Sequence, residues 1–168
     1  MINTERLRLM PLTAEELALW SSDCGKFEMA LHIKYCGEPV AGDFISFVKT
    51  AMENIRKDSQ SSLFNTIWLI VRKRDNVAMG ELAFYGPPNQ QGEVEIGYGL
   101  NESFWGNGYM AEAVHAVAKW GLTNSAVHSV IAITDNNPKS EKTLERAGFR
   151  ASSFNGTSKR WVFTEDND

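Results

Sequence analysis

The sequence contains little cysteine and no long apolar run. Cys24 and Cys36 are the only cysteines among 168 residues, and their spacing matches neither a redox motif nor a zinc-ligand motif. Two free thiols are therefore preferred over a disulfide. No apolar stretch approaches the ~20 residues that a membrane-spanning helix needs. Residues 1–6 also lack the apolar core of a signal peptide, so we expect a cytoplasmic protein without membrane contact.

Clusters of basic residues are absent as well. The chain carries 17 Lys and Arg against 21 Asp and Glu, which gives a formal net charge of -4. Because nucleic-acid binding needs grouped Lys and Arg, we expect no nucleic-acid partner. No residue pattern indicates a metal site. A chain of this length without repeats or linkers suits a single domain, residues 1–168.

Hydrophobic periodicity predicts four helices. Thr13-Ala-Glu-Glu16 has the pattern of a capping box, which predicts a short helix ending near residue 20. Apolar residues at helical spacing predict longer helices over 43–58 and 108–123, and a short helix over 140–147.

Alternating apolar residues and turn signals predict seven strands. They cover residues 6–12, 66–72, 78–85, 93–100, 129–134, 148–154 and 159–164, whereas residues 21–42 give no clear prediction. The hairpins come first and imply antiparallel pairing, but the later strand–helix–strand crossover requires parallel pairing. The order of elements therefore predicts an α/β fold with a mixed sheet.

A glycine-rich turn precedes the helix over 108–123. Glycines in Trp105-Gly-Asn-Gly-Tyr109 let the backbone turn tightly and approach a ligand closely. The first N–H groups of a helix lack partners, and the helix dipole adds partial positive charge there. These features fit a pyrophosphate site, although a lone GxG is more often a plain strand-to-helix turn. No Lys-Ser/Thr pair follows, so the segment is not a Walker A loop.

The strand over 93–100 carries Gly97 and Gly99 near its end. Glycine in a strand often marks a bulge or a close approach by another group. If this strand parts from the strand over 129–134, its free backbone groups need partners. An amide-rich pantetheine arm could fill the gap as an added strand does.

Several motifs in this order resemble those of the GNAT acetyltransferases. They are Glu95-Ile-Gly-Tyr98, Trp105-Gly-Asn-Gly-Tyr109 with Glu112-Ala113, Asn137-Pro-Lys-Ser140 and Ala147-Gly-Phe149. The opening from Thr4-Glu-Arg to Thr13-Ala-Glu-Glu16 is similar to the ribosomal-protein N-terminal acetyltransferase (RimJ/RimL-like) branch. The resemblance runs from about residue 4 to about residue 165 and implies a GNAT fold. That fold has a central mixed, mostly antiparallel sheet of about seven strands, splayed at the cofactor site and flanked by about four helices.

The resemblance also implies acetyl-CoA as cosubstrate, with an amine as the second partner. In the loop that begins at Trp105, the backbone N–H groups of Gly106, Asn107, Gly108, Tyr109 and Met110 would face the pyrophosphate. Backbone atoms of Tyr98, Gly99 and Leu100 would hold the pantetheine, and Asn137 would bond to the pantetheine or to adjacent backbone. Relatives in this family are often monomers or homodimers.

Three positions depart from the family pattern. The loop opens with Trp105 instead of Gln or Arg and ends with Met110 instead of Gly or Ala. Many relatives carry a tyrosine seven residues after the asparagine, where it protonates the leaving thiolate. Here that position is Leu144, and Ser140 is the remaining hydroxyl.

The implied reaction is direct attack of a primary amine, from a protein N-terminus or a small molecule, on the thioester in a ternary complex. A lysine-type amine with a pKa of about 10.4 costs roughly 4–5 kcal/mol to neutralise at pH 7, whereas an α-amine costs about 1 kcal/mol. Glu95 is the favoured base, or it anchors a water relay. A purely structural role, in which its carboxylate bonds neighbouring backbone, is an equal alternative. Ser140 would stabilise the thiolate, or it would be the N-cap of a helix.

Two further alternatives stay open at this point. Trp68, Phe84 and Tyr85 fit core packing, and one of them could instead line an acceptor pocket. The missing tyrosine at position 144 also suits a non-catalytic acyl-CoA-binding sensor or interaction module on the same fold.

Overall fold

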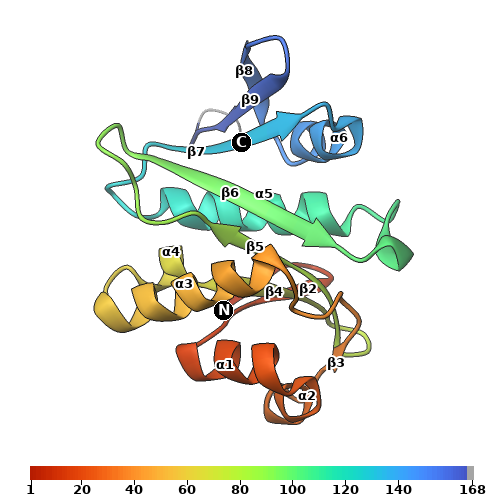
Figure 1. The fold of residues 1–168 in the computed structure, drawn as a ribbon. Helices are drawn as coiled ribbons and strands as arrows, with labels where there is room; N and C mark the ends of the chain where they lie inside the picture. Colours follow the sequence, from red (N-terminus) through yellow and green to blue (C-terminus); the bar gives the residue numbers. More distant parts are fainter. Residues whose placement is uncertain (166–168) are drawn as a thin grey trace.

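A computed structural model describes residues 1–165, whose backbone forms a mixed sheet with helices on both faces (Figure 1). The described residues contain nine strands, arranged in the order β1-β2-β4-β5-β6-β7-β9-β8, with β3 paired to β5. Among the strands of the described residues, only the pairs β6–β7 and β3–β5 are parallel. The strands are β1 (Ile2–Asn3), β2 (Leu7–Pro11), β3 (Lys34–Tyr35), β4 (Ile67–Arg72), β5 (Val77–Phe84), β6 (Glu93–Leu100), β7 (Ser129–Asp135), β8 (Arg150–Phe154) and β9 (Ser158–Phe163). The mixed, mostly antiparallel α/β fold expected from the sequence is confirmed.

Six α-helices and one 3-10 turn accompany these strands within the described part of the chain. They are α1 (Ala14–Ser22), α2 (Cys24–Leu31), α3 (Asp43–Lys57), α4 (Ser62–Asn65), the 3-10 helix η1 (Glu102–Phe104), α5 (Tyr109–Leu122) and α6 (Pro138–Arg146). Both hydrogen bonds of the predicted capping box at Thr13 and Glu16 are present, at 3.2 and 2.7 Å. None of the helices over residues 1–165 is long and apolar enough to cross a membrane.

The sequence underestimated the number of elements. It predicted about seven strands and four helices, and it missed β1, β3, α2 and α4. Each missed strand has two residues and α4 has four. These segments are too short for apolar residues to recur at the spacing of a strand or a helix. Helix α2 is held by local groups instead, since Asp23 caps its start and His32 ends it at a positive φ of 52°.

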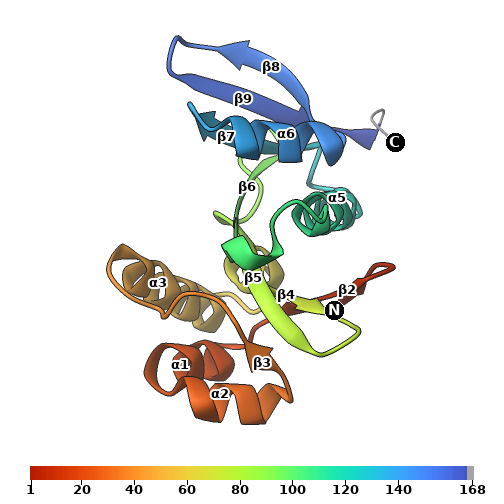
Figure 2. The ribbon, with the colours of Figure 1, turned by 90° about the vertical axis from the view of Figure 1, so that its right-hand side faces the viewer.

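Two hydrophobic clusters lie on opposite faces of the sheet. In β4, Trp68 and Ile70 pack on the side of α5, whereas Ile67 and Leu69 pack on the side of α1–α3, as strand alternation requires. Figure 2 shows α5 on one side of the sheet and α1, α2 and α3 on the other. Full burial of a side chain of this kind stabilises the fold by roughly 1.5–3 kcal/mol. Because buried side chains pack on both faces, the two clusters hold the central strands in place.

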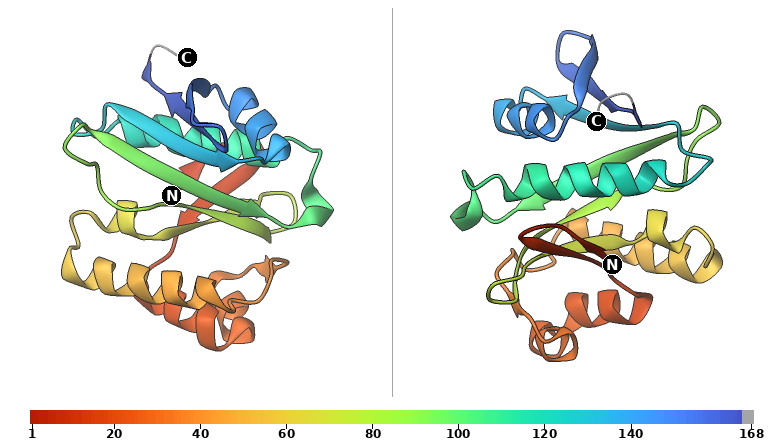
Figure 3. Two further views of the ribbon diagram at one scale, coloured as in Figure 1. Left: turned by 45° about the horizontal axis from the view of Figure 1, so that its top comes forward. Right: turned by 180° about the vertical axis from the view of Figure 1, so that it is seen from behind.

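Strands β6 and β7 pair over only part of their length. Their parallel register joins Glu93 to Ser129, Val94 to Val130 and Glu95 to Ile131, and then stops. Beyond Glu95, β6 stays with β5 while β7 stays with β9 to its end. The two ribbons diverge toward α6 (Figures 1 and 3). The strand-parting expected from the sequence is therefore a feature of the fold.

Candidate active site

The parting of β6 and β7 leaves backbone groups of β6 without strand partners. The bonds from Tyr85 N to Glu95 O and from Asn101 N to Met79 O fix the alternation of the β5–β6 ladder. By this alternation Gly97 and Gly99 direct their backbone groups to β5, whereas Ile96, Tyr98 and Leu100 direct theirs toward β7. The carbonyl of Leu100 is already used, because it accepts a hydrogen bond of 2.8 Å from Nε1 of Trp105. The pairing of Glu95 with Ile131 uses the Ile96 N–H, so the Ile96 carbonyl and the backbone groups of Tyr98 remain for an extended ligand.

The loop before α5 presents open N–H groups. Gly106 and Gly108 adopt positive φ values of 78° and 77°, which explains why glycine occupies both positions. The side-chain amide of Asn107 donates to the carbonyls of Phe104 and Trp105 at 3.1 and 2.9 Å, so the loop is held from inside. Over residues 106–110, no backbone N–H donates to an atom of the described chain. These N–H groups stand at the start of a helix, where they could hold an anion.

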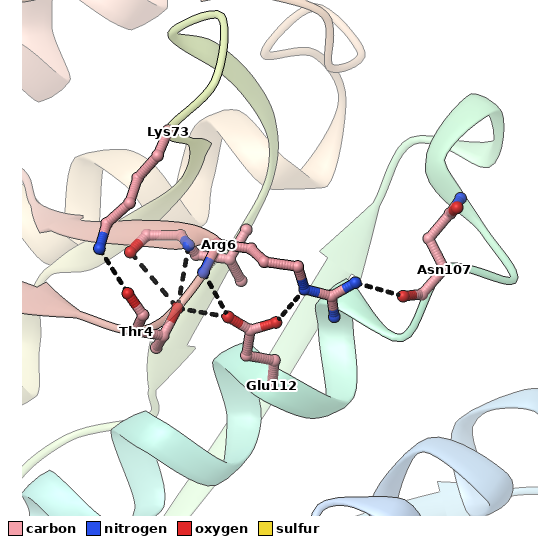
Figure 4. Close-up of polar contacts among 6 residues, drawn as sticks. Thr4, Arg6, Lys73, Asn107 and Glu112 are labelled. Carbon is pink, nitrogen blue, oxygen red and sulfur yellow. Dashed lines mark hydrogen bonds and ion pairs between the residues drawn. The ribbon is translucent and has the colours of Figure 1, made fainter.

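An ion-pair network from the N-terminal segment supports this loop (Figure 4). Nε of Arg6 lies 2.6 Å from Oε2 of Glu112 on α5, and Nη1 of Arg6 donates to the carbonyl of Asn107 at 3.0 Å. Thr4 donates to Oε1 of Glu112 at 2.5 Å, and Lys73 donates to the carbonyl of Thr4. Burial alone would raise the pKa of Glu112, but these hydrogen bonds and the charge of Arg6 together lower it. The network ties the loop to the first strands of the sheet.

Tyr98 and Ser140 form a hydroxyl pair at the open end of the parted strands. Their side-chain oxygens lie 2.7 Å apart, and the Tyr98 hydroxyl also lies 3.3 Å from the Ser140 carbonyl. Burial raises the pKa of Tyr98, although its bond to Ser140 opposes this shift. Leu144 is fully buried in the core and contributes no polar group. The sequence assigned only backbone atoms of Tyr98 to the site, because its pairing with Ser140 depends on how α6 packs.

The start of α6 corrects one interpretation from the sequence. The helix begins at Pro138, not at Ser140, and the residue that caps it is Asn137. The side-chain oxygen of Asn137 accepts a hydrogen bond of 3.1 Å from the Ser140 N–H. Proline suits the first helical position because its missing N–H has no partner there. Ser140 is therefore not an N-cap, and its hydroxyl is available to Tyr98.

Glu95 lies in a small hollow between the parted strands. This hollow of about 160 Å³ is lined by Glu95, Tyr85, Tyr98 and Ser140, among others, so it brings the two predicted catalytic residues together. Burial raises the pKa of Glu95. Glu93 is engaged elsewhere, since it pairs with Arg160 at 2.5 Å. Of the two glutamates on this face, Glu95 is the one that reaches the hollow.

The three aromatic residues of the central hairpin separate into two kinds. Trp68 and Phe84 are buried in the core, with 1% and 2% of their surface exposed. Tyr85 is 61% exposed and lines the hollow beside Glu95. Core packing thus holds for Trp68 and Phe84, whereas Tyr85 borders the site.

Sequence reasoning missed Glu81 on β5. Its register partner on β6 is Gly99, and a Cβ at Gly99 would lie 2.7 Å from Oε1 of Glu81. A Cβ at Gly97 would likewise clash with the hydroxyl of Tyr85. The close approach predicted at these two glycines is therefore made by side chains of Glu81 on β5 and of Tyr85 directly after it. In the sequence, only the two glycines indicated a close approach. They did not reveal which side chains pack over them.

Comparison with known proteins agrees with this geometry. The model of a family described as an acetyltransferase (GNAT) domain matches residues 6–150. The uncharacterized N-acetyltransferase YjdG of Bacillus subtilis (strain 168) is 29% identical over 164 residues, which cover 97% of each chain.

Solved structures share the fold at lower identity. RimL, a ribosomal L7/L12 alpha-N-protein acetyltransferase in complex with coenzyme A, matches with a TM-score of 0.67 and 18% identity over 98% of this chain and 97% of its own. The structure of AAC(6')-Ib with paromomycin and acetyl-CoA matches with a TM-score of 0.66 and 16% identity over 97% of this chain and 96% of its own.

Proposed function

Because this chain belongs to the acetyltransferase (GNAT) domain family, we propose that it transfers the acetyl group of acetyl-CoA to a primary amine. The observation that carries the proposal is the parting of β6 from β7 after Glu95 and Ile131. This gap ends beside the open N–H groups of residues 106–110 and beside the Tyr98–Ser140 pair. One surface thus offers an anion cradle, an amide-binding slot and a proton-donating pair.

The residues of the loop and of β6 fit the coenzyme. The N–H groups of Gly106, Asn107, Gly108, Tyr109 and Met110 would bind its pyrophosphate, since these groups are unpaired within the described chain. The Ile96 carbonyl and the backbone groups of Tyr98 would bind the pantetheine amides in the manner of an added strand. Trp105 and Leu100 close the slot through their mutual hydrogen bond. The coenzyme supplies the activated acetyl group.

Three side chains of the hollow would handle the protons of the reaction. The amine nitrogen bonds to the acetyl carbon, the carbon–sulfur bond breaks, and the sulfur leaves as a thiolate. Glu95 accepts the proton that the amine loses, either directly or through water. The Tyr98–Ser140 pair donates a proton toward the sulfur. It thereby performs the role of the tyrosine that many relatives carry at the position of Leu144. Asn137 positions this pair by capping α6.

The acceptor is a primary amine with an accessible neutral form. An α-amine loses its proton at a cost of about 1 kcal/mol near pH 7, against roughly 4–5 kcal/mol for a lysine-type amine. The proposal includes two kinds of acceptor, a protein N-terminus and a small-molecule amine.

Thiol release from acetyl-CoA in the presence of an amine panel tests the proposal. The panel should contain peptides with free N-termini, arylalkylamines, polyamines and aminoglycosides. We expect acetyl-CoA to raise the melting temperature and at least one amine to release free thiol. The alternative, a non-catalytic acyl-CoA-binding module, predicts the same thermal shift with no thiol release. No thermal shift at saturating acetyl-CoA would remove both.

A further inference from the structure

A second hollow opens on the face of the sheet that α3 covers. It has a volume of about 230 Å³ and lies between α3 and the strands β5 and β6. It shares Tyr85, Gly97 and Tyr98 with the smaller hollow that contains Glu95 and Ser140. A molecule in the second hollow would therefore reach the place where the proposed reaction occurs.

Aromatic rings form most of one wall of this hollow. Phe44 and Phe47 of α3 stack with ring centroids 5.9 Å apart, and Phe47 meets Tyr85 edge-on at 5.9 Å. Such a wall favours a flat apolar group and also attracts a cation through the ring faces. An apolar cavity of about 150 Å³ holds benzene. The present hollow thus has room for a ring with a short arm.

Glu81 is the one charged residue among those that line the hollow. Its side chain lies across Gly99, and within residues 1–165 burial is the one influence on its pKa, with no hydrogen bond contributing. Lysine and arginine are absent from the lining. An ionised carboxylate in an apolar wall needs a cationic partner, because burial without one is unfavourable. Glu81 is partly exposed at this hollow, and a bound cation would supply the charge partner that the lining lacks.

The surroundings of Glu81 leave its charge poorly compensated. Burial raises the pKa of Glu81 to about 7. Tyr35 of β3 is close enough for the charge of Glu81 to act on it, and Tyr85, directly after β5, and Tyr98 of β6 line the same hollow. Burial raises the pKa of each of these tyrosines. Helix α3 contributes only the rings of Phe44 and Phe47 to the lining. A bound ammonium would be the only cation in the pocket.

We propose that this hollow is the acceptor pocket, that it takes a small primary amine carried on a flat apolar group, and that Glu81 binds the ammonium. The inference rests on the proposed acetyltransferase function. It narrows the acceptors from any primary amine to arylalkylamine-like molecules, in which a short chain joins a ring to the amine. Glu81 governs how tightly the amine binds, whereas Glu95 governs the proton transfer that follows.

The test compares wild-type protein with the isosteric variant Glu81→Gln, using 2-phenylethylamine as the probe. Glu53→Gln is the matched control, because Glu53 lies on the same helix as Phe47 but is exposed. Its Oε2 lies 3.8 Å from Nζ of Lys57. At mildly alkaline pH we expect Glu81→Gln to raise the KM for the amine at least about tenfold, as loss of a charged hydrogen bond implies. The KM for acetyl-CoA should stay within about twofold, since Glu81 is not among the groups proposed to bind the coenzyme.

Direct titration of 2-phenylethylamine into the protein with bound coenzyme A separates this inference from the proposed function. Binding that depends on Glu81, together with no thiol release, would contradict catalysis and leave the pocket assignment standing. Thiol release with 2-phenylethylamine and an unchanged KM in Glu81→Gln would overturn the role of Glu81. No binding of the amine to wild-type protein, or preferential acetylation of spermidine, would overturn the pocket assignment. The neutral alcohol 2-phenylethanol should compete poorly, because it offers no cation to the carboxylate.

Discussion

Nε of Arg6 lies 2.6 Å from Oε2 of Glu112, although 106 residues separate them in the chain. The pair joins the segment before β2 to the first turns of α5, and Arg6 also reaches the carbonyl of Asn107 in the glycine-rich loop. The shape of the proposed pyrophosphate site in the middle of the chain thus depends on a residue near the N-terminus. Arg6 is a positioning residue for that loop.

Glu112→Gln should weaken both the fold and the loop. We expect the free energy of unfolding to fall by about 1–2 kcal/mol at neutral pH, because Arg6 and Thr4 lose a charged acceptor. The pKa of Glu112 is lowered in the folded protein, so its contribution is present above the ordinary value of 4.5 and is lost as pH falls through the lowered pKa. Urea unfolding across this pH range measures the difference. Glu5→Gln, at an exposed neighbouring position, should show no such effect at any pH.

Gly106→Asp should abolish the stabilisation of the protein by acetyl-CoA. The new carboxylate would stand among the N–H groups of the proposed pyrophosphate site and would repel the pyrophosphate. Gly156→Asp is a matched control, since both glycines have positive φ, 78° and 94°, with no atom within 4 Å of an added Cβ. Thermal melting with and without acetyl-CoA makes the comparison. An equal loss of the ligand-induced shift in both variants would contradict a pyrophosphate site at this loop.

Glu81→Gln should stabilise the protein in a pH-dependent manner. Burial raises the pKa of Glu81 from 4.5 to about 7, so the folded state binds a proton that the unfolded chain releases between these values. The free energy of unfolding of the wild-type protein therefore falls as the pH rises from about 4.5 to about 7. Above this range it stays about 3 kcal/mol lower, as a pKa shift of this size implies. The variant should gain most of this amount above about pH 8 and little below about pH 4.5. A gain of equal size at both ends would show that ionisation of Glu81 is not the cause.

Tyr98→Phe and Ser140→Ala should each slow catalysis without weakening coenzyme binding. We expect kcat to fall about 10- to 100-fold in either variant, because the pair loses the hydrogen bond of 2.7 Å that prepares the proton donor. The double variant should be little worse than either single one, since the two hydroxyls act as a unit. Steady-state kinetics with acetyl-CoA provide the measurement. Ser125→Ala, at an exposed turn, should retain full activity.

Glu95→Gln should lower kcat and change its pH profile. Burial raises the pKa of Glu95, and a base must be ionised to accept a proton. In wild-type protein kcat should therefore fall as pH decreases through the raised pKa, and the variant should lack this limb. Glu93→Gln is the control on the same face of the same strand, where the side chain pairs with Arg160. A water relay that does not involve Glu95 would leave the wild-type profile in both variants.

Periodic and capping patterns determined the main elements of this protein. The alternation in residues 93–100, the small apolar face of α5 and the capping box at Thr13 are local features, so their structures follow from neighbouring residues. The positive φ angles in Gly106-Asn-Gly108 are local too, which is why the loop before α5 was predictable. The short elements β1, β3, α2 and α4 were missed because a few residues carry no period.

Tertiary structure alone decided which side chains meet. Glu81 crosses Gly99 only because β5 and β6 pair in one register, and Tyr98 meets Ser140 only because α6 packs beside the parted strands. Arg6 finds Glu112 through the placement of β2 beside the start of α5. Such contacts depend on distances between segments that are remote in the chain. The sequence by itself determined the longer helices and strands and the glycine-rich loop before α5, whereas packing determined the proposed acceptor pocket and its carboxylate.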